Sequence, residues 1–280
     1  MNKYLVIGNP IEHSLSPLLH NYWFKKYRFL DSIYEKKKVE KKDLKKIVEQ
    51  IKNDEIKGVN VTVPFKREIF DFIDTAPHEV QFTKSVNTLV KENDKVVGYN
   101  TDQEGFEISL EENKWDFKNK KVFIIGAGGV TPSILSSFIR ADGAEKIYLS
   151  NRTRSKAEEL KKFWDKAIDF YQMNKDTIEI IDWGEKSELC DLIINTTSVG
   201  LARDEKLDFD FSDYNNNKEA LFYDLIYNPK ETNFLKEAKI RENKTMNGKM
   251  MFLYQAQKAF EIWHGIKPDI DDEVKDLLND

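Results

Sequence analysis

One stretch decides the fold: Val122-Phe123-Ile124-Ile125-Gly126-Ala127-Gly128-Gly129-Val130, in which a short apolar run passes directly into three glycines. Such a run is typical of a buried strand, and the residues after the glycines are expected to begin a helix. Glycine is required at this kind of turn, because a Cβ atom would keep the backbone away from a pyrophosphate. The amides of the helix N-terminus would then face the anion. The stretch therefore predicts a cofactor site over residues 126–130.

The glycine pattern departs from the usual dinucleotide-binding sequence, Gly-x-Gly-x-x-Gly, because Thr131 occupies the position of the third glycine. We expect Gly129 to take over part of the close-packing role, with altered local packing and retained binding. Pro132 suits the first turn of the following helix, where no amide donor is needed. A tight turn without a ligand is the alternative, but the order of strand, glycines, helix and second strand favours the cofactor site.

The segment after the second strand, residues 146–150, indicates which cofactor is bound. In a site for NAD, an Asp or Glu there accepts hydrogen bonds from the ribose 2′-hydroxyl. This chain instead continues Asn151-Arg152-Thr153-Arg154-Ser155-Lys156, which contains no carboxylate. Guanidinium groups bind a 2′-phosphate that an acid would repel. The segment therefore predicts NADP(H), with ordinary surface charge at Arg152 and Arg154 as the alternative.

Strands and helices alternate along almost the whole chain, which predicts an α/β protein. Further apolar strands are expected at residues 192–194 and 221–225, so that the second part of the chain forms a Rossmann-type, doubly wound parallel sheet. An amphipathic helix containing Phe106 and Leu110 leads into it. An apolar helix at residues 250–263 must pack on one of the domains.

Three regions follow from this alternation. We expect an α/β substrate-binding domain over residues 1–102, an NADP-binding domain over residues 103–247, and C-terminal helices over residues 248–280, with a cleft between the two domains. The first region contains its own signals: a strand at residues 4–7, a helix that starts at Pro17 with Ser16 as N-cap and with Leu18, Leu19, Tyr22 and Trp23 on one face, a strand at residues 59–63, and a hairpin at residues 85–99 with Asn93-Asp94 at its tip.

Composition excludes several classes of protein. Hydrophobic residues make up 40% and charged residues 33% of the 280 residues, and the net charge of -5 argues against nucleic acid as a partner. The lysine-rich stretch at residues 35–46 is interleaved with acids and is expected to be a solvated surface. The single Cys190 allows no internal disulfide, and the four histidines lack metal-ligand spacing. We therefore expect a protein without a metal. No signal peptide or membrane span is predicted, so we also expect a cytoplasmic protein.

The first region contains polar residues in apolar surroundings. Ser14 and Ser16 lie in a loop before a helix, where hydroxyls and free amides could bind a carboxylate. By period-two alternation, Asn60 and Thr62 share one face of a strand. The same region also contains Lys66, Asn87 and Asp102. Each of these residues taken alone could equally be a cap, a turn residue or a surface residue.

Taken together, the segments of this chain resemble the shikimate dehydrogenase family. The resemblance covers nearly the whole chain in the same order. Its most specific segment is Asn60-Val61-Thr62-Val63-Pro64-Phe65-Lys66. The other matching segments are residues 8–11, 13–17, 86–88, 100–102 with Gly105, 126–129, 151–153, 223–225 with Tyr227, and Gly248 with Gln255.

The resemblance implies reversible reduction of 3-dehydroshikimate to shikimate by NADPH, on the pathway to aromatic amino acids. It implies that Ser14 and Ser16 bind the substrate carboxylate and that Tyr227 reaches the substrate from the cofactor domain. The remaining implied substrate ligands are Asn60, Thr62, Lys66, Asn87, Asp102 and Gln255. The implied cofactor ligands are Gly126, Ala127, Gly128, Gly129, Val130, Asn151, Arg152, Thr153, Arg154, Lys156, Leu225 and Gly248.

Two of these residues are expected to carry the chemistry. Hydride that arrives at a carbonyl carbon leaves an alkoxide, which needs an acid within hydrogen-bonding reach. We expect Lys66 to be that acid, and the base in the reverse direction, with Asp102 orienting it. The helical region that contains Gln255 is expected to return to the first domain.

Departures from the family pattern leave alternatives open. Lys156 stands where the family usually has arginine, and a lysine cannot form the bidentate fork, so Arg154 is expected to compensate. A quinate/shikimate dehydrogenase with relaxed substrate or NAD use is the nearest alternative, and a non-catalytic nucleotide sensor is a more distant one. Monomer and homodimer are both open, and no role is assigned to His78.

Overall fold

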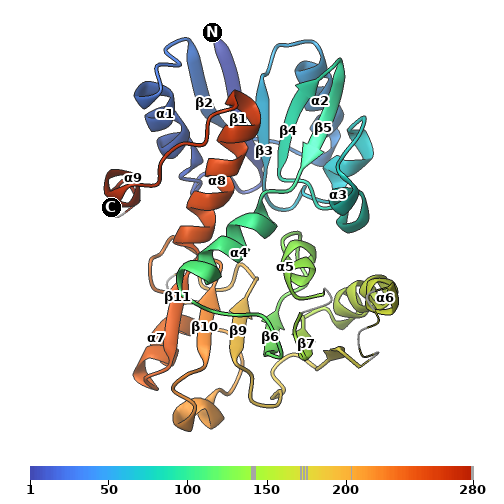
Figure 1. The fold of residues 1–280 in the computed structure, drawn as a ribbon, viewed down its shortest axis with the longest axis vertical. Coiled ribbons are helices and arrows are strands. Elements are labelled where there is room, and N and C mark those ends of the chain that lie inside the picture. The colour runs from blue at the N-terminus through green and yellow to red at the C-terminus, as the bar shows by residue number, and fades with distance from the viewer. Residues whose placement is uncertain (140–142, 171, 173, 175, 203, 279–280) are drawn as a thin grey trace. The chain divides into compact units, whose positions relative to one another are not determined.

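The computed structural model describes residues 1–139, 143–170, 172, 174, 176–202 and 204–278. Within it the chain divides into two compact units. Unit 1 comprises Met1–Phe106 and Leu253–Asp280, and unit 2 comprises Glu107–Phe252. Each unit contains one β-sheet covered by helices (Figure 1).

The sheet of unit 1 is mixed and has the strand order β2-β1-β3-β4-β5. The first three strands are parallel, whereas β4 and β5 form an antiparallel hairpin. Asn93 and Asp94 connect them with positive φ angles, as a tight hairpin turn requires, so the predicted hairpin is confirmed. The strands are β1 (Asn2–Gly8), β2 (Ser32–Lys38), β3 (Gly58–Val61), β4 (Thr88–Glu92) and β5 (Lys95–Tyr99).

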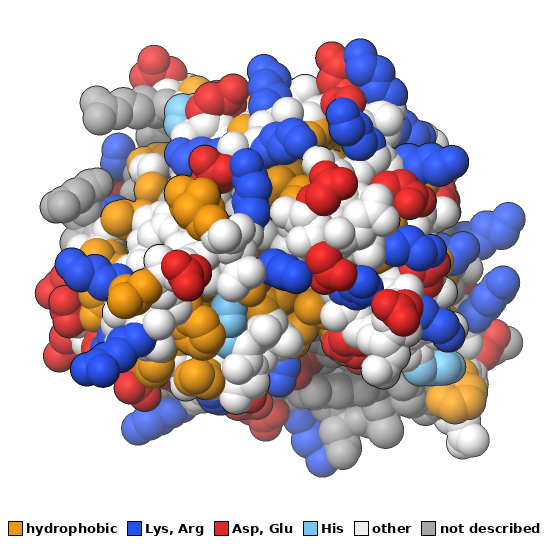
Figure 2. All heavy atoms as spheres, turned by 90° about the horizontal axis from the view of Figure 1, so that it is seen from above, with side chains coloured by type: hydrophobic (Ala, Val, Ile, Leu, Met, Phe, Trp, Pro, Cys, Tyr) orange, Lys and Arg blue, Asp and Glu red, His pale blue; other side chains and the backbone are white. Residues whose placement is uncertain are grey.

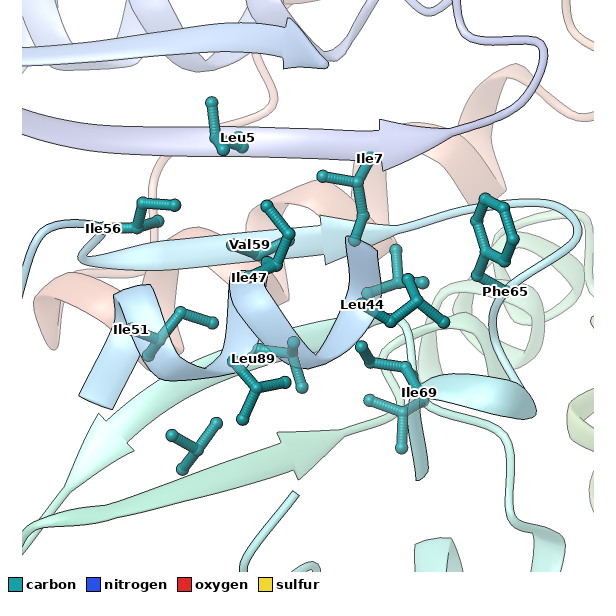
Figure 3. Packing of buried hydrophobic residues seen from close by; sticks show 14 of the residues in the cluster. Leu5, Ile7, Leu44, Ile47, Ile51, Ile56, Val59, Phe65, Ile69 and Leu89 are labelled. Carbon is teal, nitrogen blue, oxygen red and sulfur yellow. The ribbon is translucent and has the colours of Figure 1, made fainter. Parts of the chain in front are cut away.

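Helix α2 (Leu44–Lys52) packs on one face of the sheet of unit 1. Its apolar residues recur at helical spacing and therefore lie on one side of the helix. Leu44, Ile47 and Ile51 point toward the sheet, where they meet Ile7 and Val59 (Figure 3). The other helical segments of unit 1 are α1 (Ser16–Lys26), η1 (Lys41–Asp43), η2 (Glu68–Phe72), α3 (His78–Thr83) and α9 (Asp272–Asp276), together with the start of α4 (Asp102–Glu112) and most of α8 (Lys249–His264).

Two local predictions for unit 1 were wrong. Ser16 is not the N-cap of α1 but its first residue, because the Ser14 hydroxyl already accepts the Ser16 amide at 3.3 Å. Leu18 does not share the buried face, since the residue is 47% exposed and the helix packs through Leu19 and Trp23 instead.

The third strand also ends earlier than predicted. It ends at Val61, because the Thr62 carbonyl accepts a hydrogen bond from the Phe65 amide at 3.0 Å and the chain turns there. Val63 is consequently half exposed. The segment that was expected to close a strand therefore forms a turn, and this turn leads into Lys66.

The apolar helix α8 packs on the sheet of unit 1 from Leu253 onward. The ring of Trp263 lies 5.2 Å from that of Tyr4, and its indole Nε1 donates to the Leu89 carbonyl at 3.1 Å. Gly58 permits this contact, since a Cβ atom there would lie 2.4 Å from the same nitrogen. The helix therefore has a fixed register against β3 and β4.

Charges of both signs are mixed on the face of the molecule drawn in Figure 2. In the lysine-rich stretch at residues 35–46, Glu35 pairs with Lys3 and Glu40 with Lys42, and these four side chains are well exposed. This agrees with a solvated surface. Among the described helices, none is long and apolar enough to cross a membrane.

Unit 2 contains an all-parallel sheet with the strand order β11-β10-β9-β6-β7-β8. The order reverses between β6 and β9, which confirms the predicted doubly wound sheet, and ligands of such sheets bind at the carboxyl ends of the strands at this reversal. The strands are β6 (Lys121–Ile125), β7 (Lys146–Ser150), β8 (Ile178–Ile180), β9 (Leu192–Asn195), β10 (Leu221–Asp224) and β11 (Lys244–Asn247), and the helical segments are α5 (Thr131–Phe138), α6 (Arg154–Phe170), η3 (Ser212–Asn216) and α7 (Asn233–Ile240), together with most of α4.

Candidate functional site

Unit 1 contains a buried ion pair. Lys66 follows the turn after β3, and Asp102 is the first residue of α4. The Lys66 Nζ lies 2.7 Å from the Asp102 Oδ2, and the two side chains are only 10% and 6% exposed. Because these residues are 36 positions apart, the fold alone brings them together. A shielded lysine next to a carboxylate can hold a proton at a defined position.

The backbone on both sides of the pair is held in place. The Lys66 carbonyl accepts the Val86 amide at 2.8 Å, and the Asn100 side chain accepts the Asp102 amide at 3.0 Å, which caps α4. These bonds hold the two backbone segments from which the ammonium and the carboxylate extend. The site is therefore preorganised within unit 1.

Asn87 connects the segment that precedes Asp102 to the sheet of unit 1. Its Oδ1 accepts from the Thr101 amide at 2.9 Å and from the Thr88 hydroxyl at 3.0 Å. Its Nδ2 donates to the Thr101 hydroxyl at 2.9 Å. Thr101 immediately precedes Asp102, so Asn87 fixes the position of the backbone from which the Asp102 side chain extends.

Asn60 lies beside Asn87, but its amide is already used. Its Nδ2 donates to the Asn87 carbonyl at 3.2 Å and to the Thr88 hydroxyl at 3.0 Å, and its Oδ1 accepts from the Tyr34 hydroxyl at 2.6 Å. Both amide protons are therefore used within the protein. This geometry favours a positioning role for Asn60 over direct contact with a ligand. Tyr34 was missed in the sequence, where nothing in its lysine-rich strand singles it out.

The remaining predicted substrate residues of unit 1 lie on three segments. The hydroxyl of Ser14 donates to that of Ser16 at 3.2 Å, so the two serines face each other. Thr62 lies against Gly8, where a Cβ atom would meet the Thr62 methyl at 2.5 Å. Gln255 is half-buried on α8. The hydroxyl pair fits a carboxylate ligand.

The glycine turn of unit 2 has one closed side and one open side. Gly126 has a φ of +119°, and a Cβ atom there would lie 2.4 Å from the Thr196 hydroxyl. A Cβ atom at Gly128 would meet no protein atom within 4 Å. This is the shape of an anion cradle: tight where the turn meets the sheet and open where a pyrophosphate would lie. The residues therefore fit a dinucleotide.

Thr131, the residue in place of the third glycine, closes the turn through its hydroxyl. Its side chain is fully buried, and its Oγ1 accepts the Gly128 amide at 3.1 Å. The same oxygen lies 3.2 Å from the Gly126 carbonyl and 3.0 Å from the Thr196 hydroxyl. A hydroxyl thus stabilises the turn that other members of this fold class pack with glycine.

The segment after β7 is joined to the glycine turn. The Asn151 Oδ1 accepts the Ala127 amide at 3.0 Å, and the Asn151 Nδ2 donates to the Thr153 carbonyl at 2.8 Å. Arg152 and Lys156 are exposed. Arg154 differs from both, because carboxylates of Glu158 and Asp182 pair with its guanidinium.

The other predicted cofactor residues, Leu225 and Gly248, lie where β10 ends and where α8 begins. A Cβ atom at Gly248 would lie 2.0 Å from the Leu225 carbonyl oxygen, and the Gly248 amide donates to the Ile226 carbonyl at 3.1 Å. Tyr227 stacks on Phe252 with ring centroids 4.4 Å apart. The loop after β10 is therefore packed directly against the start of α8.

Asp224, which lies in the matching segment 223–225 but was assigned no role from the sequence, holds this loop in place. It is fully buried at the end of β10, where its Oδ1 accepts from the Asn195 side chain and the Ile226 amide, both at 3.0 Å. Its Oδ2 accepts from the Thr232 hydroxyl at 2.5 Å. Burial raises the pKa of this carboxyl from its ordinary value of 3.8 to about 6. An acid at the end of an apolar strand was the available signal.

Replacement of Asp224 by Asn should change how stability depends on pH. The folded state binds the proton of Asp224 more tightly than the unfolded state, so ionisation of this group destabilises the fold above pH 6 and this cost is relieved as the pH falls toward 4. The free energy of unfolding of Asp224→Asn relative to the parent should therefore fall by on the order of 3 kcal/mol between pH 7 and pH 4. Urea denaturation at each pH measures it. Asp208→Asn, at an exposed carboxylate, should show no such trend, and an equal trend in both variants contradicts the assignment.

Three titratable residues among those that the structure describes, His20, His264 and Cys190, offer no competing centre. Burial lowers the pKa of His20 to about 3 and that of His264 to about 4, and both rings lie in an aromatic cluster with Phe260. Burial also raises the pKa of the Cys190 thiol to about 12, so it is a poor nucleophile. Within the described ranges, no group of three or more His, Cys, Asp or Glu residues could hold a metal ion.

Three family models match successive parts of the chain. Residues 6–89 match the shikimate dehydrogenase substrate binding domain, residues 109–237 match shikimate / quinate 5-dehydrogenase, and residues 251–272 match the shikimate 5'-dehydrogenase C-terminal domain. The matches contain Lys66 and Asn87, the glycine turn, and Gln255, respectively.

Individual proteins are similar over the whole chain. A shikimate dehydrogenase (NADP(+)) of Pelagibacter ubique is 48% identical over 276 residues, which cover 99% of this chain and 98% of the relative. A crystal structure of a shikimate dehydrogenase in complex with NADP+ superposes with a TM-score of 0.88 and 33% identity, covering 100% of this chain and 95% of the other. For a Thermus thermophilus enzyme in complex with NADP(H) and shikimate, the values are 0.81 and 26%, with coverage of 100% and 99%.

Proposed function

The chain belongs to the shikimate dehydrogenase family, and on that premise we propose that it catalyses the reversible NADPH-dependent reduction of 3-dehydroshikimate to shikimate in aromatic amino acid biosynthesis. The observation that carries this proposal is the buried contact of 2.7 Å between the Lys66 Nζ and the Asp102 Oδ2. A nucleotide sensor would not need Lys66 and Asp102 to be kept together. A carbonyl reductase needs such a proton donor.

The proton transfer follows from the position of Lys66. NADPH, when bound, supplies the hydride that adds to the carbonyl carbon, and the two π electrons of the carbonyl move to its oxygen. Lys66 donates one proton from its ammonium to that oxygen, which yields the substrate hydroxyl and a neutral amine. Solvent then returns a proton to Lys66, and the reverse reaction uses the neutral amine as base. Asp102 holds the Nζ in position and accepts a hydrogen bond from a substrate hydroxyl.

Other residues of unit 1 would bind and orient the substrate. The facing hydroxyls of Ser14 and Ser16 are assigned to the carboxylate, and Thr62 and Gln255 to ring hydroxyls. We assign Asn87 to both tasks, since it holds the chain before Asp102. Asn60 is assigned to positioning, because Tyr34 and Asn87 already use its amide. Tyr227 remains a proposed substrate contact from unit 2.

The residues of unit 2 suit an NADP cofactor. The open side of Gly128 suits the pyrophosphate, and Arg152 and Lys156 are assigned to the 2′-phosphate. Leu225 and Gly248 are assigned to the nicotinamide end. The proposal also includes a cytoplasmic location, small molecules as the only ligands, and a monomer or homodimer as the active form.

The proposed function is tested by steady-state kinetics on the purified full-length protein. Shikimate with NADP+ should give NADPH, followed by its absorbance, with a kcat/KM at least ten times that for quinate or for NAD+. A higher kcat/KM with quinate and NAD+ would replace the proposal by a quinate/shikimate dehydrogenase. Tight NADPH binding without any turnover would replace it by a nucleotide sensor.

A further inference from the structure

The three cations after β7 do not have equal surroundings. The Arg154 Nε lies 2.8 Å from the Glu158 Oε1, and its Nη1 pairs with the Asp182 Oδ1. Neither Arg152 nor Lys156 forms a side-chain hydrogen bond or ion pair with another residue that the structure describes. Arg154 therefore has two carboxylates that compete for its guanidinium, whereas Arg152 and Lys156 have none among the described residues.

Helical geometry separates Arg154 from Lys156. Both lie in the first turn of α6, two residues apart, and residues two apart on a helix point about 200° away from each other. Glu158, four residues after Arg154, is on the same face as Arg154. That face borders a groove that Arg154, Glu158 and Lys161 line together with β8. Arg154 thus points toward β8, and Lys156 points elsewhere.

Asp182 lies at the edge of the sheet where the cofactor is expected. It follows β8, and its backbone carbonyl accepts the hydroxyl of Ser150, the last residue of β7, at 3.3 Å. The carboxyl ends of parallel strands meet at this edge, and the adenosine ribose of a dinucleotide binds at the end of the second strand. The carboxylate of Asp182 is therefore next to the proposed site of the 2′-phosphate.

The charges of this cluster do not attract an anion. Arg154 contributes +1 and the two carboxylates contribute −2, so the Arg154–Asp182–Glu158 triad has a net charge of about −1 at neutral pH. All three side chains are about half exposed, at 48%, 56% and 53%. Exposed ion pairs are individually weak, so both carboxylates together are needed to hold the guanidinium.

We propose that Asp182 and Glu158 withhold Arg154 from the 2′-phosphate, so that Arg152 and Lys156 alone bind it and the two acids set the preference for NADP over NAD. The proposal rests on the assignment of NADP(H) as cofactor in the proposed function. It makes Asp182 and Glu158 specificity-determining residues that lower NADPH affinity. It also reverses the expectation that Arg154 compensates for a lysine at position 156.

The test compares Arg154→Met in two backgrounds of the full-length protein. Dissociation constants for NADPH and NADH are measured by fluorescence titration at constant salt. Asp182→Asn with Glu158→Gln should raise NADPH affinity about threefold to tenfold, because the freed guanidinium can now pair with a phosphate. Arg154→Met should lower NADPH affinity by less than about fivefold in the parent, and its effect should be about three to ten times larger in the double variant, equal to the affinity gained there. NADH affinity should change less than about twofold throughout, since NADH has no 2′-phosphate.

Two controls separate the possible outcomes. Asp165→Asn removes an acid that pairs with Lys161 on the same helix, eleven residues from Arg154, and should leave NADPH affinity unchanged. A tenfold or larger loss for Arg154→Met in the parent, equal in both backgrounds, overturns the inference and makes Arg154 a direct ligand. An unchanged NADPH affinity in the double variant also overturns it. If the parent itself neither binds NADPH nor oxidises shikimate, the proposed function is what has failed.

Discussion

Replacement of Lys66 by Met should lower kcat for shikimate oxidation by about 10²–10⁴-fold, the range that general acid–base catalysis contributes. Methionine has nearly the same length and shape as lysine but no proton to exchange. The dissociation constant for shikimate should change less than about tenfold, because the other ligands of the substrate remain. Initial rates of NADPH formation give kcat, and calorimetric titration gives the dissociation constant. A kcat within tenfold of the parent would refute the assignment of Lys66.

The stability of this variant must be checked, since the substitution leaves Asp102 buried without its partner. The loss of one member of a buried ion pair costs about 3–5 kcal/mol. Lys66→Arg keeps the charge and the partner of Asp102 but does not release a proton near neutral pH, so it should fold and still lose most turnover. Lys91→Met breaks a pair with Asp54 of 2.6 Å elsewhere in unit 1 and should leave kcat unchanged.

Substitution of Gly126 by Ala should lower both stability and NADPH affinity. The backbone φ of +119° is strained for any residue with a Cβ, at a cost of about 1–3 kcal/mol. The added methyl would also lie 2.4 Å from the Thr196 hydroxyl, which cannot move freely because it is hydrogen-bonded at 3.0 Å to the Ile125 carbonyl. We expect a shifted turn and NADPH affinity lower by about 100-fold, equivalent to about 3 kcal/mol.

Gly128→Ala is the matched comparison, because its Cβ atom would meet no protein atom within 4 Å. Its stability without cofactor should stay within about 0.5 kcal/mol of the parent, as for a surface substitution. Its NADPH affinity should nevertheless fall at least tenfold, since the methyl would occupy the space assigned to the pyrophosphate. Thermal denaturation and fluorescence titration of both variants measure the two quantities. If Gly128→Ala binds NADPH as tightly as the parent, the pyrophosphate does not lie on the open side of the turn.

Local sequence was sufficient wherever neighbouring residues determine the conformation. The apolar run at residues 122–125 forms β6 because a short, continuous apolar segment is stable only when it is buried in a sheet. The hairpin tip at Asn93 and Asp94 was predictable because these residue types tolerate positive φ. The alternation of strand and helix after Lys121 likewise predicted the parallel sheet of unit 2.

Predictions from local patterns were wrong where another contact of the same residue or segment determined the conformation. Serine is a residue type that often caps helices, but here the Ser14 hydroxyl accepts a hydrogen bond from the Ser16 amide, and Ser16 is the first residue of the helix. Leu18 fits an apolar helical face, but the face that packs is determined by the aromatic rings of unit 1 around Trp23. Thr62 fits the alternation of a strand, but the turn to Phe65 ends that strand one residue earlier.

The sequence by itself determined the glycine turn, the kind of sheet that contains it, and the residue types available for catalysis, because each follows from the order and spacing of residue types along the chain. Only the tertiary structure decided which of those residues work together. It joined Lys66 to Asp102, assigned the amide of Asn60 to Tyr34, and paired Arg154 with Asp182. The partners of each pair lie far apart in sequence. For the two buried pairs, a polar group is stable only if the fold supplies its partner. The chemistry of the site therefore depends on distances that composition and spacing do not contain.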